Sequence, residues 1–147
     1  MADLPTSVLF CCTYNAIRSP MAEAILKALH GHHIYVDSVG VREGELDPFA
    51  VAALDEIGID LARHRPKTFD DLEDDFADLV VSLSPEAHHR ALEMTRTSAC
   101  EVEYWPTFDP SLTEGTREMR LEGYRRVRDQ LYDAILARFP LQGGPSV

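Results

Sequence analysis

Residues 12–19, CTYNAIRS, combine a cysteine with an arginine and a serine six and seven positions later. A short apolar run typical of a buried strand precedes this stretch, and an amphipathic helical pattern follows it. A loop between a strand end and a helix start points its amide N–H groups at a bound anion such as phosphate. The same positive potential favours the thiolate of Cys12, so its sulfur could attack the bound anion.

This spacing is specific. With three cysteines, 12 arginines and 16 serines or threonines in 147 residues, about 0.03 chance matches to Cys-x5-Arg-Ser/Thr are expected. The alternative is a structural cysteine, followed by an arginine in solvent and a serine that caps a helix.

A phosphate-binding loop is predicted at 13–18. Its backbone amides and the Arg18 guanidinium would surround the phosphoryl oxygens, because the planar guanidinium binds two of them at once. Ser19 is predicted to cap the following helix and to donate its hydroxyl to the Cys12 thiolate. The predicted loop residues are Thr13, Tyr14, Asn15, Ala16, Ile17 and Arg18.

Thiolate attack on a phosphate monoester also needs an acid for the leaving oxygen, and Asp109 is the best candidate. It follows a predicted strand and precedes Pro110, which favours an extended backbone at Asp109. Nearby Trp105 and Phe108 are expected to shield the carboxyl from water and so help it hold a proton. The alternative is an Asp-Pro turn, and Asp47 before Pro48 is interpreted as such a helix cap.

Composition indicates one domain over residues 1–147, ending in a loose tail at 141–147. No apolar run approaches the roughly 18 residues of a membrane span, and the first residues lack a signal peptide's features. Three cysteines, two of them adjacent, indicate free thiols in the cytoplasm. The net charge of −11 disfavours nucleic acid and anionic membranes as partners. We expect a monomer or a weak dimer.

Alternating strands and helices predict an α/β fold, a three-layer αβα sandwich around a central four-stranded parallel sheet. Ligands of such folds bind at the carboxyl ends of the strands, where the Cys12 loop is placed. Strands are predicted at 7–11, 34–36 (closing at 38–40), 78–83 and 101–105. Helices are predicted at 19–30, 48–57, 84–94 and 116–139, with a short turn from 68 to 72.

Residues 8–23, VLFCCTYNAIRSPMAE, resemble the signature of the low-molecular-weight protein tyrosine phosphatase family. Segments 58–60, 64–65, 77–80 and 109–110 also fall where that family has similar ones. The resemblance implies a phosphatase without metal or cofactor that forms a cysteinyl-phosphate intermediate. Its substrates would be phosphotyrosyl proteins or small aryl phosphates, with inorganic phosphate as product and inhibitor. It also implies that Asn15 holds the loop in shape, with Ser19 and His64 as hydrogen-bond partners.

The sequence departs from that family at several points. Ile17 stands where a second loop cysteine is frequent, and Cys11 is expected on the opposite side of its strand from Cys12. Tyr14 replaces a common glycine at the rim of the pocket, and Ser111–Leu112 replaces a common pair of tyrosines. The family's substrate preference, and the protection of its catalytic cysteine by a loop disulfide, are therefore not predicted for this protein.

Two other functions stay open. Thioredoxin-linked arsenate reductases share the fold and use two further cysteines after the third strand. Here Ser84 occupies the first of those positions, and Cys100 alone cannot complete the relay, although a small thiol could replace it. A catalytically idle phosphate-binding module is the third interpretation, and Tyr14 is its support.

Other polar residues are predicted to be structural or solvated. Histidines 30, 32, 33, 88 and 89 are expected on the surface rather than at a metal, and Cys100 as a small buried hydrophobe. The arginines between 117 and 128 are expected to form ion pairs rather than an anion-binding groove. Trp105 is expected either in the core or along the cleft.

Overall fold

The computed structural model describes residues 4–72 and 77–141. Four parallel strands form one sheet in the order β2-β1-β3-β4. The strands are β1 (Ser7–Cys12), β2 (Tyr35–Gly40), β3 (Leu79–Ser82) and β4 (Glu101–Tyr104). The helices are α1 (Arg18–His30), α2 (Pro48–Asp55), α3 (Pro85–Met94) and α4 (Arg117–Arg138), with short 3-10 turns η1 (Phe69–Asp71) and η2 (Pro110–Leu112).

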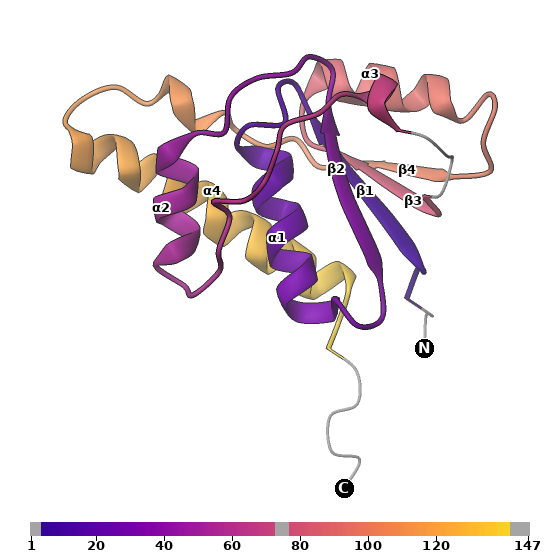
Figure 1. Cartoon of the computed structure of the whole chain (residues 1–147), viewed down its shortest axis with the longest axis horizontal. Helices are drawn as coiled ribbons and strands as arrows, with labels where there is room; N and C mark the ends of the chain where they lie inside the picture. Colours follow the sequence, from indigo (N-terminus) through magenta and orange to yellow (C-terminus); the bar gives the residue numbers. More distant parts are fainter. Residues whose placement is uncertain (1–3, 73–76, 142–147) are drawn as a thin grey trace, which may run out of the picture.

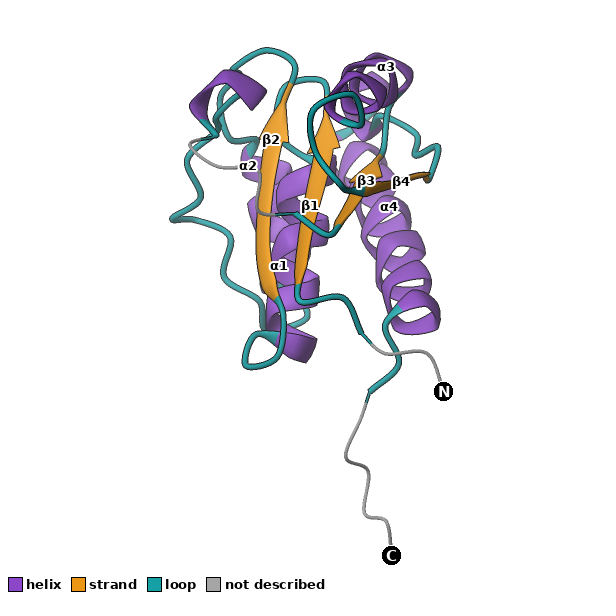
Figure 2. Ribbon diagram, turned by 90° about the vertical axis from the view of Figure 1, so that its right-hand side faces the viewer, coloured by secondary structure: helices purple, strands orange, loops and turns teal. Residues whose placement is uncertain are grey.

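Helices cover both faces of the sheet (Figures 1 and 2). Residues of α1, α2 and α4 form the larger hydrophobic cluster with one face, whereas α3 and η1 pack on the other. The predicted αβα sandwich with a four-stranded parallel sheet is therefore confirmed. Crossover connections place every strand's carboxyl end at the same edge of the sheet, where ligands bind in such folds.

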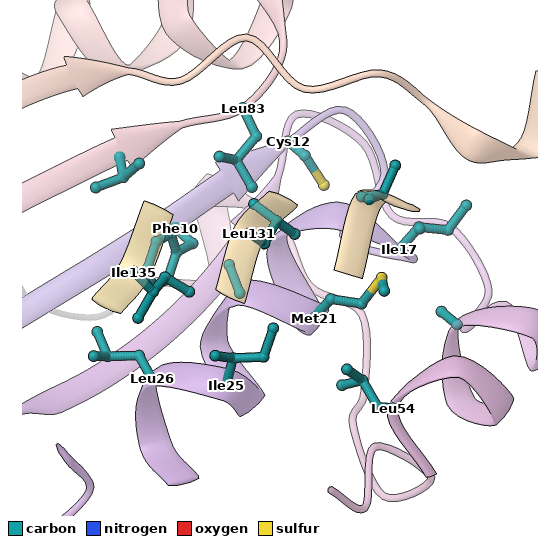
Figure 3. Packing of buried hydrophobic residues seen from close by; sticks show 14 of the residues in the cluster. Phe10, Cys12, Ile17, Met21, Ile25, Leu26, Leu54, Leu83, Leu131 and Ile135 are labelled. Atoms are coloured by element: carbon teal, nitrogen blue, oxygen red, sulfur yellow. The ribbon is translucent and has the colours of Figure 1, made fainter. Parts of the chain in front are cut away.

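Strand β1 lies in the middle of the molecule and is buried along its whole length. Its side chains alternate between the two clusters because successive residues of a strand point to opposite faces. Phe10 and Cys12 join the larger cluster, and Leu9 and Cys11 join the smaller one. The adjacent cysteines therefore point to opposite faces, as the sequence predicted. Figure 3 shows Cys12 at the margin of the packed core.

Capping residues place three helices where the sequence predicted them. Asp47 accepts a hydrogen bond from the Phe49 amide at the start of α2, and Ser84 and Thr116 do the same for α3 and α4. The short turn after Thr68 is also present as η1, with a capping box between Thr68 and Asp71. These side chains accept hydrogen bonds from backbone N–H groups at the start of each helix, which would otherwise lack a partner.

The start of α1 corrects one prediction. The helix begins at Arg18 and its N-cap position is Ile17, which makes no side-chain capping bond. Ser19 lies inside the first turn and is not the cap, because its hydroxyl is hydrogen-bonded to Cys12 and Asn15 instead.

Several segment ends differ from the predictions by one or two residues. Helix α2 ends at Asp55, and Gly58 adopts a positive φ of 78° as the chain turns back. Ile57 therefore lies beyond the helix and is 39% exposed, not in the core. Strand β2 begins at Tyr35, one residue later than predicted, and runs without a break to Gly40.

Other predicted surface residues have structural contacts. His30 is buried, with its Nε2 2.7 Å from the Phe139 carbonyl oxygen, so the prediction of a solvated side chain was wrong. His88 stacks on Tyr104 and lies 2.9 Å from the Ser82 hydroxyl. Cys100, which was predicted to be buried, is instead partly exposed and packs against the smaller cluster. The predicted tail beyond residue 141 lies outside the described residues.

No helix in the described ranges is both long and apolar enough to cross a membrane.

Candidate active site

Cys12 is the last residue of β1, so its side chain lies at the carboxyl edge of the sheet. The thiol is almost fully buried, and Sγ lies 2.9 Å from the Ser19 hydroxyl oxygen. Ser19 belongs to the first turn of α1, so the helix fixes the hydroxyl beside the sulfur. A hydroxyl in this position can donate to a thiolate and stabilise its charge.

Asn15 organises the loop between Cys12 and Ser19. Its φ of 54° is the left-handed conformation that asparagine tolerates better than most residues. The buried side-chain amide donates to the hydroxyls of Ser19, at 2.8 Å, and Ser38, at 2.9 Å. Because Ser19 accepts this bond, its own hydroxyl proton can be donated to Cys12 Sγ, at 2.9 Å, or to the more distant Val39 carbonyl, at 3.4 Å.

The carbonyl end of the same side chain is also used. Asn15 Oδ1 accepts the Lys67 backbone N–H at 3.0 Å and lies 2.9 Å from His64 Nε2. The contacts that the family resemblance implied, from Asn15 to Ser19 and His64, are therefore present. Each acceptor and donor of this amide has a protein partner, which fixes the backbone of the loop.

A buried carboxylate lies behind the loop. Ser38 donates to Glu23 Oε1 at 2.5 Å, and His64 Nδ1 lies 3.7 Å from the same oxygen. Burial lowers the pKa of His64, and the nearby Glu23 carboxylate opposes this shift. Sequence reasoning missed Glu23 and Ser38, because a lone acid on a helix and a serine in a strand carry no local signal.

Strand β2 and the segment after it form a wall along the loop. A Cβ at Gly40 would lie 2.7 Å from the Asn15 nitrogen and 2.8 Å from the Tyr14 carbonyl carbon, so this approach requires glycine. Beyond β2, the amides of Arg42, Gly44 and Asp47 donate to carbonyls of Thr13, Tyr14 and Ala16, respectively. The Tyr14 side chain is 48% exposed at the rim, with the Arg42 guanidinium 5.4 Å from its ring centroid.

Arg18 links the loop to the segment that carries Asp109. Its guanidinium is 8% exposed and donates through Nη1 to the Thr107 carbonyl at 2.9 Å. The Thr107 amide in turn donates to the Leu83 carbonyl, just past the end of β3. The acid-bearing segment is thus anchored at the carboxyl edge two residues before Asp109.

Asp109 is half-buried and caps η2. Its Oδ1 accepts from the amide of Ser111 at 3.0 Å and from its hydroxyl at 2.7 Å. No hydrogen bond between described residues joins Asp109 to Cys12 or Arg18. Phe108 is 57% exposed, and Trp105 is half-buried with its ring edge-on to Phe10 and near Phe139. Trp105 therefore packs against the core, one of its two predicted positions.

The other cysteines lie away from Cys12. The Cys11 side chain is fully buried on the opposite face, where burial, and secondarily the Cys12 charge, raises the pKa of its thiol. Cys100 directly precedes β4, at the amino edge of the sheet. The strand register places it five residues from the level of Cys12, which is about 16 Å along the strands.

Ser84 lies directly beside the phosphate loop. Its hydroxyl accepts a hydrogen bond from the Thr13 hydroxyl at 3.1 Å and also caps α3 through the Ala87 amide. The position assigned to a relay thiol by resemblance is therefore close to the loop, but it holds a serine. In the described parts of the chain, no group of three or more His, Cys, Asp or Glu side chains is arranged to hold a metal.

This arrangement is typical of enzymes that use a cysteine to act on phosphate-like anions. It consists of a thiol at a strand end, an arginine at a helix start and a hydrogen-bonded loop between them. Residues 7–138 match the family model described as low molecular weight phosphotyrosine protein phosphatase. The chain belongs to this family of phosphatases and arsenate reductases.

The chain is similar both to proteins named arsenate reductases and to proteins named phosphatases. An arsenate reductase of Bacillus subtilis is 36% identical over 127 residues, which cover 84% of this chain and 88% of that protein. A low molecular weight protein tyrosine phosphatase from T. tengcongensis superposes with a TM-score of 0.72 at 29% identity, covering 88% of this chain and 94% of the other. YwlE arginine phosphatase, a mutant with a phosphorylated active-site serine, gives a TM-score of 0.69 at 25% identity, with coverage of 91% and 97%.

Proposed function

We propose that the protein hydrolyses phosphotyrosine and other aryl phosphate monoesters through a cysteinyl-phosphate intermediate. The observation that carries this proposal is the 2.9 Å contact between Cys12 Sγ and the Ser19 hydroxyl, within a loop that Asn15 fixes. A thiolate held this way, in a loop that ends at the nearly buried Arg18, is prepared for attack on a bound phosphoryl group.

The reaction would proceed in two displacements. In the first, Cys12 Sγ forms a bond to phosphorus while the bond to the aryl oxygen breaks, and Asp109 protonates that oxygen. In the second, Asp109 takes a proton from water, the water oxygen attacks phosphorus and the bond to sulfur breaks. Arg18 and the loop amides would hold the phosphoryl oxygens in both steps, releasing inorganic phosphate and the free thiolate.

Two contacts support the role proposed for Asp109. Ser111 occupies Oδ1, which leaves Oδ2 to carry the proton in this mechanism. The carbonyl contact of Arg18 with Thr107 anchors the segment close to the arginine that would bind the phosphoryl group. The phosphorylated serine in the YwlE structure supports phosphoryl transfer to a side chain in this fold.

The exposed Tyr14 ring at the rim favours an aromatic leaving group, since aromatic rings pack well on one another. Phosphotyrosyl proteins and small aryl phosphates are therefore the proposed substrates. We further propose that the protein is cytoplasmic, since three cysteines outside disulfide bonds suit a reducing compartment. We also propose that it is a monomer or a weak dimer.

Arsenate reduction is a second candidate, favoured by relatives that are named arsenate reductases at 36% and 37% identity. Reduction of arsenate to arsenite needs two electrons, which a thiol relay commonly supplies. Cys11 is buried on the far face and Cys100 lies at the other edge of the sheet, so neither is placed to accept oxidation from Cys12. This activity would need an external low-molecular-weight thiol as reductant.

The deciding experiment compares turnover of p-nitrophenyl phosphate, across pH, with thiol-dependent arsenate reduction. Cys12→Ser should abolish aryl phosphate turnover, and Asp109→Asn should lower kcat about 10²–10⁴-fold, as loss of a general acid does. Cys100→Ser is the matched thiol control and should retain activity. Phosphoarginine is a further probe because of the YwlE likeness.

Each outcome distinguishes the candidates. Full activity of Cys12→Ser would overturn the phosphatase proposal. Arsenate reduction without aryl phosphate turnover would establish the second candidate. Binding of inorganic phosphate with no turnover of any probe would establish the catalytically idle module.

A further inference from the structure

Helix α4 carries two arginines that differ from their neighbours. Arg117 and Arg120 are exposed, and within the described part of the chain neither forms an ion pair with a carboxylate. Their guanidinium carbons lie instead 5.6 and 4.8 Å from the ring centroid of Phe49. The arginines of α4 with carboxylate partners are Arg125, Arg126, Arg128 and Arg138. The predicted ion-paired surface is thus present on the rest of the helix but not at its start.

This arginine pair is connected to the phosphate loop through short contacts. Phe49 packs on Tyr124 with ring centroids 5.2 Å apart, and the Tyr124 hydroxyl donates to Asp47 Oδ2 at 2.7 Å. The Asp47 amide donates to the Ala16 carbonyl of the loop. Figure 1 shows the first turns of α4 beside α2, whose first residues follow this wall of the site.

The helix that carries the pair also contacts the segment of the candidate acid. Burial raises the pKa of Tyr124, the hydrogen bond to Asp47 and the charge of Asp109 act in the same direction, and the charge of Arg120 opposes them. The η2 turn that Asp109 caps packs on α4 as well.

Charge makes this arrangement unusual. The chain has 25 acidic residues against 14 lysines and arginines, so carboxylate partners are abundant. Cations in the first turn of a helix oppose its dipole, so the position of Arg117 does not favour folding. A guanidinium stacked on an aromatic face keeps its N–H edge available, which suits bidentate binding of a carboxylate.

We infer that Arg117 and Arg120, whose guanidinium groups lie over the Phe49 ring, form a subsite on this protein. The subsite would bind acidic residues that flank the phosphorylated tyrosine of a protein substrate. This inference rests on the proposed phosphatase function and specifies its substrates. Long-range repulsion by the acidic protein disfavours anionic peptides, so short-range donors beside the cleft would decide which of them bind.

The test uses three phosphotyrosine peptides of one length, flanked on both sides by glutamate, glutamine or lysine. For the unmodified protein, kcat/KM for the glutamate peptide should exceed that for the glutamine peptide about three- to tenfold at low salt, the range that two exposed charge pairs give. The ratio should fall towards one as salt is added.

The double variant Arg117→Gln/Arg120→Gln should bring this ratio to about one, the loss expected when both charge pairs are removed. Arg126→Gln is the matched control, since Arg126 is 81% exposed on the same helix, and it should keep the ratio. An unchanged ratio in the double variant, or an equal loss in Arg126→Gln, would overturn the subsite. The proposed function fails separately, if the unmodified protein turns over neither p-nitrophenyl phosphate nor any peptide.

Discussion

The two loops that meet at the candidate site are held in different ways. Asn15 and Ser19 of the phosphate loop are fully buried and hydrogen-bonded to each other. The Asn15 amide also bonds to three distant segments, through the side chains of Ser38 and His64 and the backbone N–H of Lys67. The acid segment around Asp109 is more exposed, and the carboxylate is held by its neighbour Ser111.

This difference matches the two chemical tasks that we propose for these loops. A cradle for phosphoryl transfer must be fixed before the substrate arrives, because a preorganised site does not have to reorient its dipoles during the reaction. An acid that serves two steps, first as donor and then as base, must exchange protons with a leaving group and with water. The hydrogen bonds that hold the Asp109 carboxylate come from the neighbouring Ser111, so small displacements of this side chain cost little free energy.

The largest effect is expected where the buried loop loses its central side chain. Asn15→Ala would leave buried polar groups without partners and would remove the asparagine's tolerance of a positive φ. We expect unfolding to become easier by about 2–4 kcal/mol. Denaturant unfolding and p-nitrophenyl phosphate turnover should both show it, with kcat/KM falling at least about 100-fold as the oxyanion donors lose their alignment.

Ser38→Ala is a graded control, because it removes one of these hydrogen bonds and should have a smaller effect. Equal stability of Asn15→Ala and the unmodified protein would mean that the loop is not fixed by this amide.

The next largest effect concerns the packing of the acid segment on α4. A Cβ at Gly123 would lie 2.5 Å from the Thr113 Oγ1 and 3.2 Å from its Cβ. Gly123→Ala should therefore displace the segment that carries Asp109, lowering kcat about tenfold, since an acid group out of position loses much of its contribution.

The inhibition constant of inorganic phosphate should stay the same in Gly123→Ala, because the phosphate loop is untouched. The double variant Gly123→Ala/Thr113→Ala, which removes both the hydroxyl and the methyl group that the new Cβ would meet, should recover part of kcat. A parallel rise in the phosphate inhibition constant would show that the two loops move together.

A smaller effect is expected from pH acting on the support of the phosphate loop. Burial lowers the pKa of His64 in the folded protein below its ordinary value near 6.5. The unfolded chain then binds more protons, so this contribution to stability is complete above about pH 6.5 and declines as the pH falls below it. Urea unfolding between pH 8 and 5 should show the decline, and His64→Asn should reduce its slope.

Surface carboxylates change the stability in a lower pH range, which separates their effect from that of His64. Ion pairs with Arg125 and Arg128 lower the pKa of Glu56 to about 2. Stability from that group is therefore present above the unfolded value near 4.5 and is lost only as the pH falls towards 2. A slope between pH 8 and 5 that His64→Asn leaves unaltered would contradict the assignment to His64.

The smallest effect on kcat is expected from loss of the hydrogen bond between the Ser111 hydroxyl and Asp109. Ser111→Ala removes a hydroxyl donor to Asp109 but keeps the backbone N–H that also donates to it. We expect kcat within about threefold of the unmodified value, because one exposed hydrogen bond contributes little. A pH–rate profile measures it, and a larger change would indicate that the hydroxyl, rather than the whole segment, sets the position of the acid.

The sequence predicted the sheet and the phosphate loop because their signals are local. A cysteine, a fixed spacing, an arginine and a buried apolar run lie within about 20 adjacent residues. The layered fold followed from the alternation of strand and helix patterns.

Features that depend on residues distant in the chain were not predicted. The support of Asn15 by Ser38 and Lys67, and the contact of Arg18 with Thr107, arise where separate strands end at one edge. Ser19 shows the limit within the local motif. Its type and position indicated a helix cap, but a thiol and an amide compete for the same hydroxyl and occupy it.

The opposite orientations of Cys11 and Cys12 have a consequence for oxidative damage. Peroxide that converts Cys12 to a sulfenic acid would leave it without a neighbouring thiol, because Cys11 faces the other cluster and Ile17 occupies the nearby loop position. The next oxidation step, to sulfinic acid, is not reversed by ordinary thiols. Recovery of the protein after peroxide stress therefore depends on how quickly small cellular thiols reach the loop.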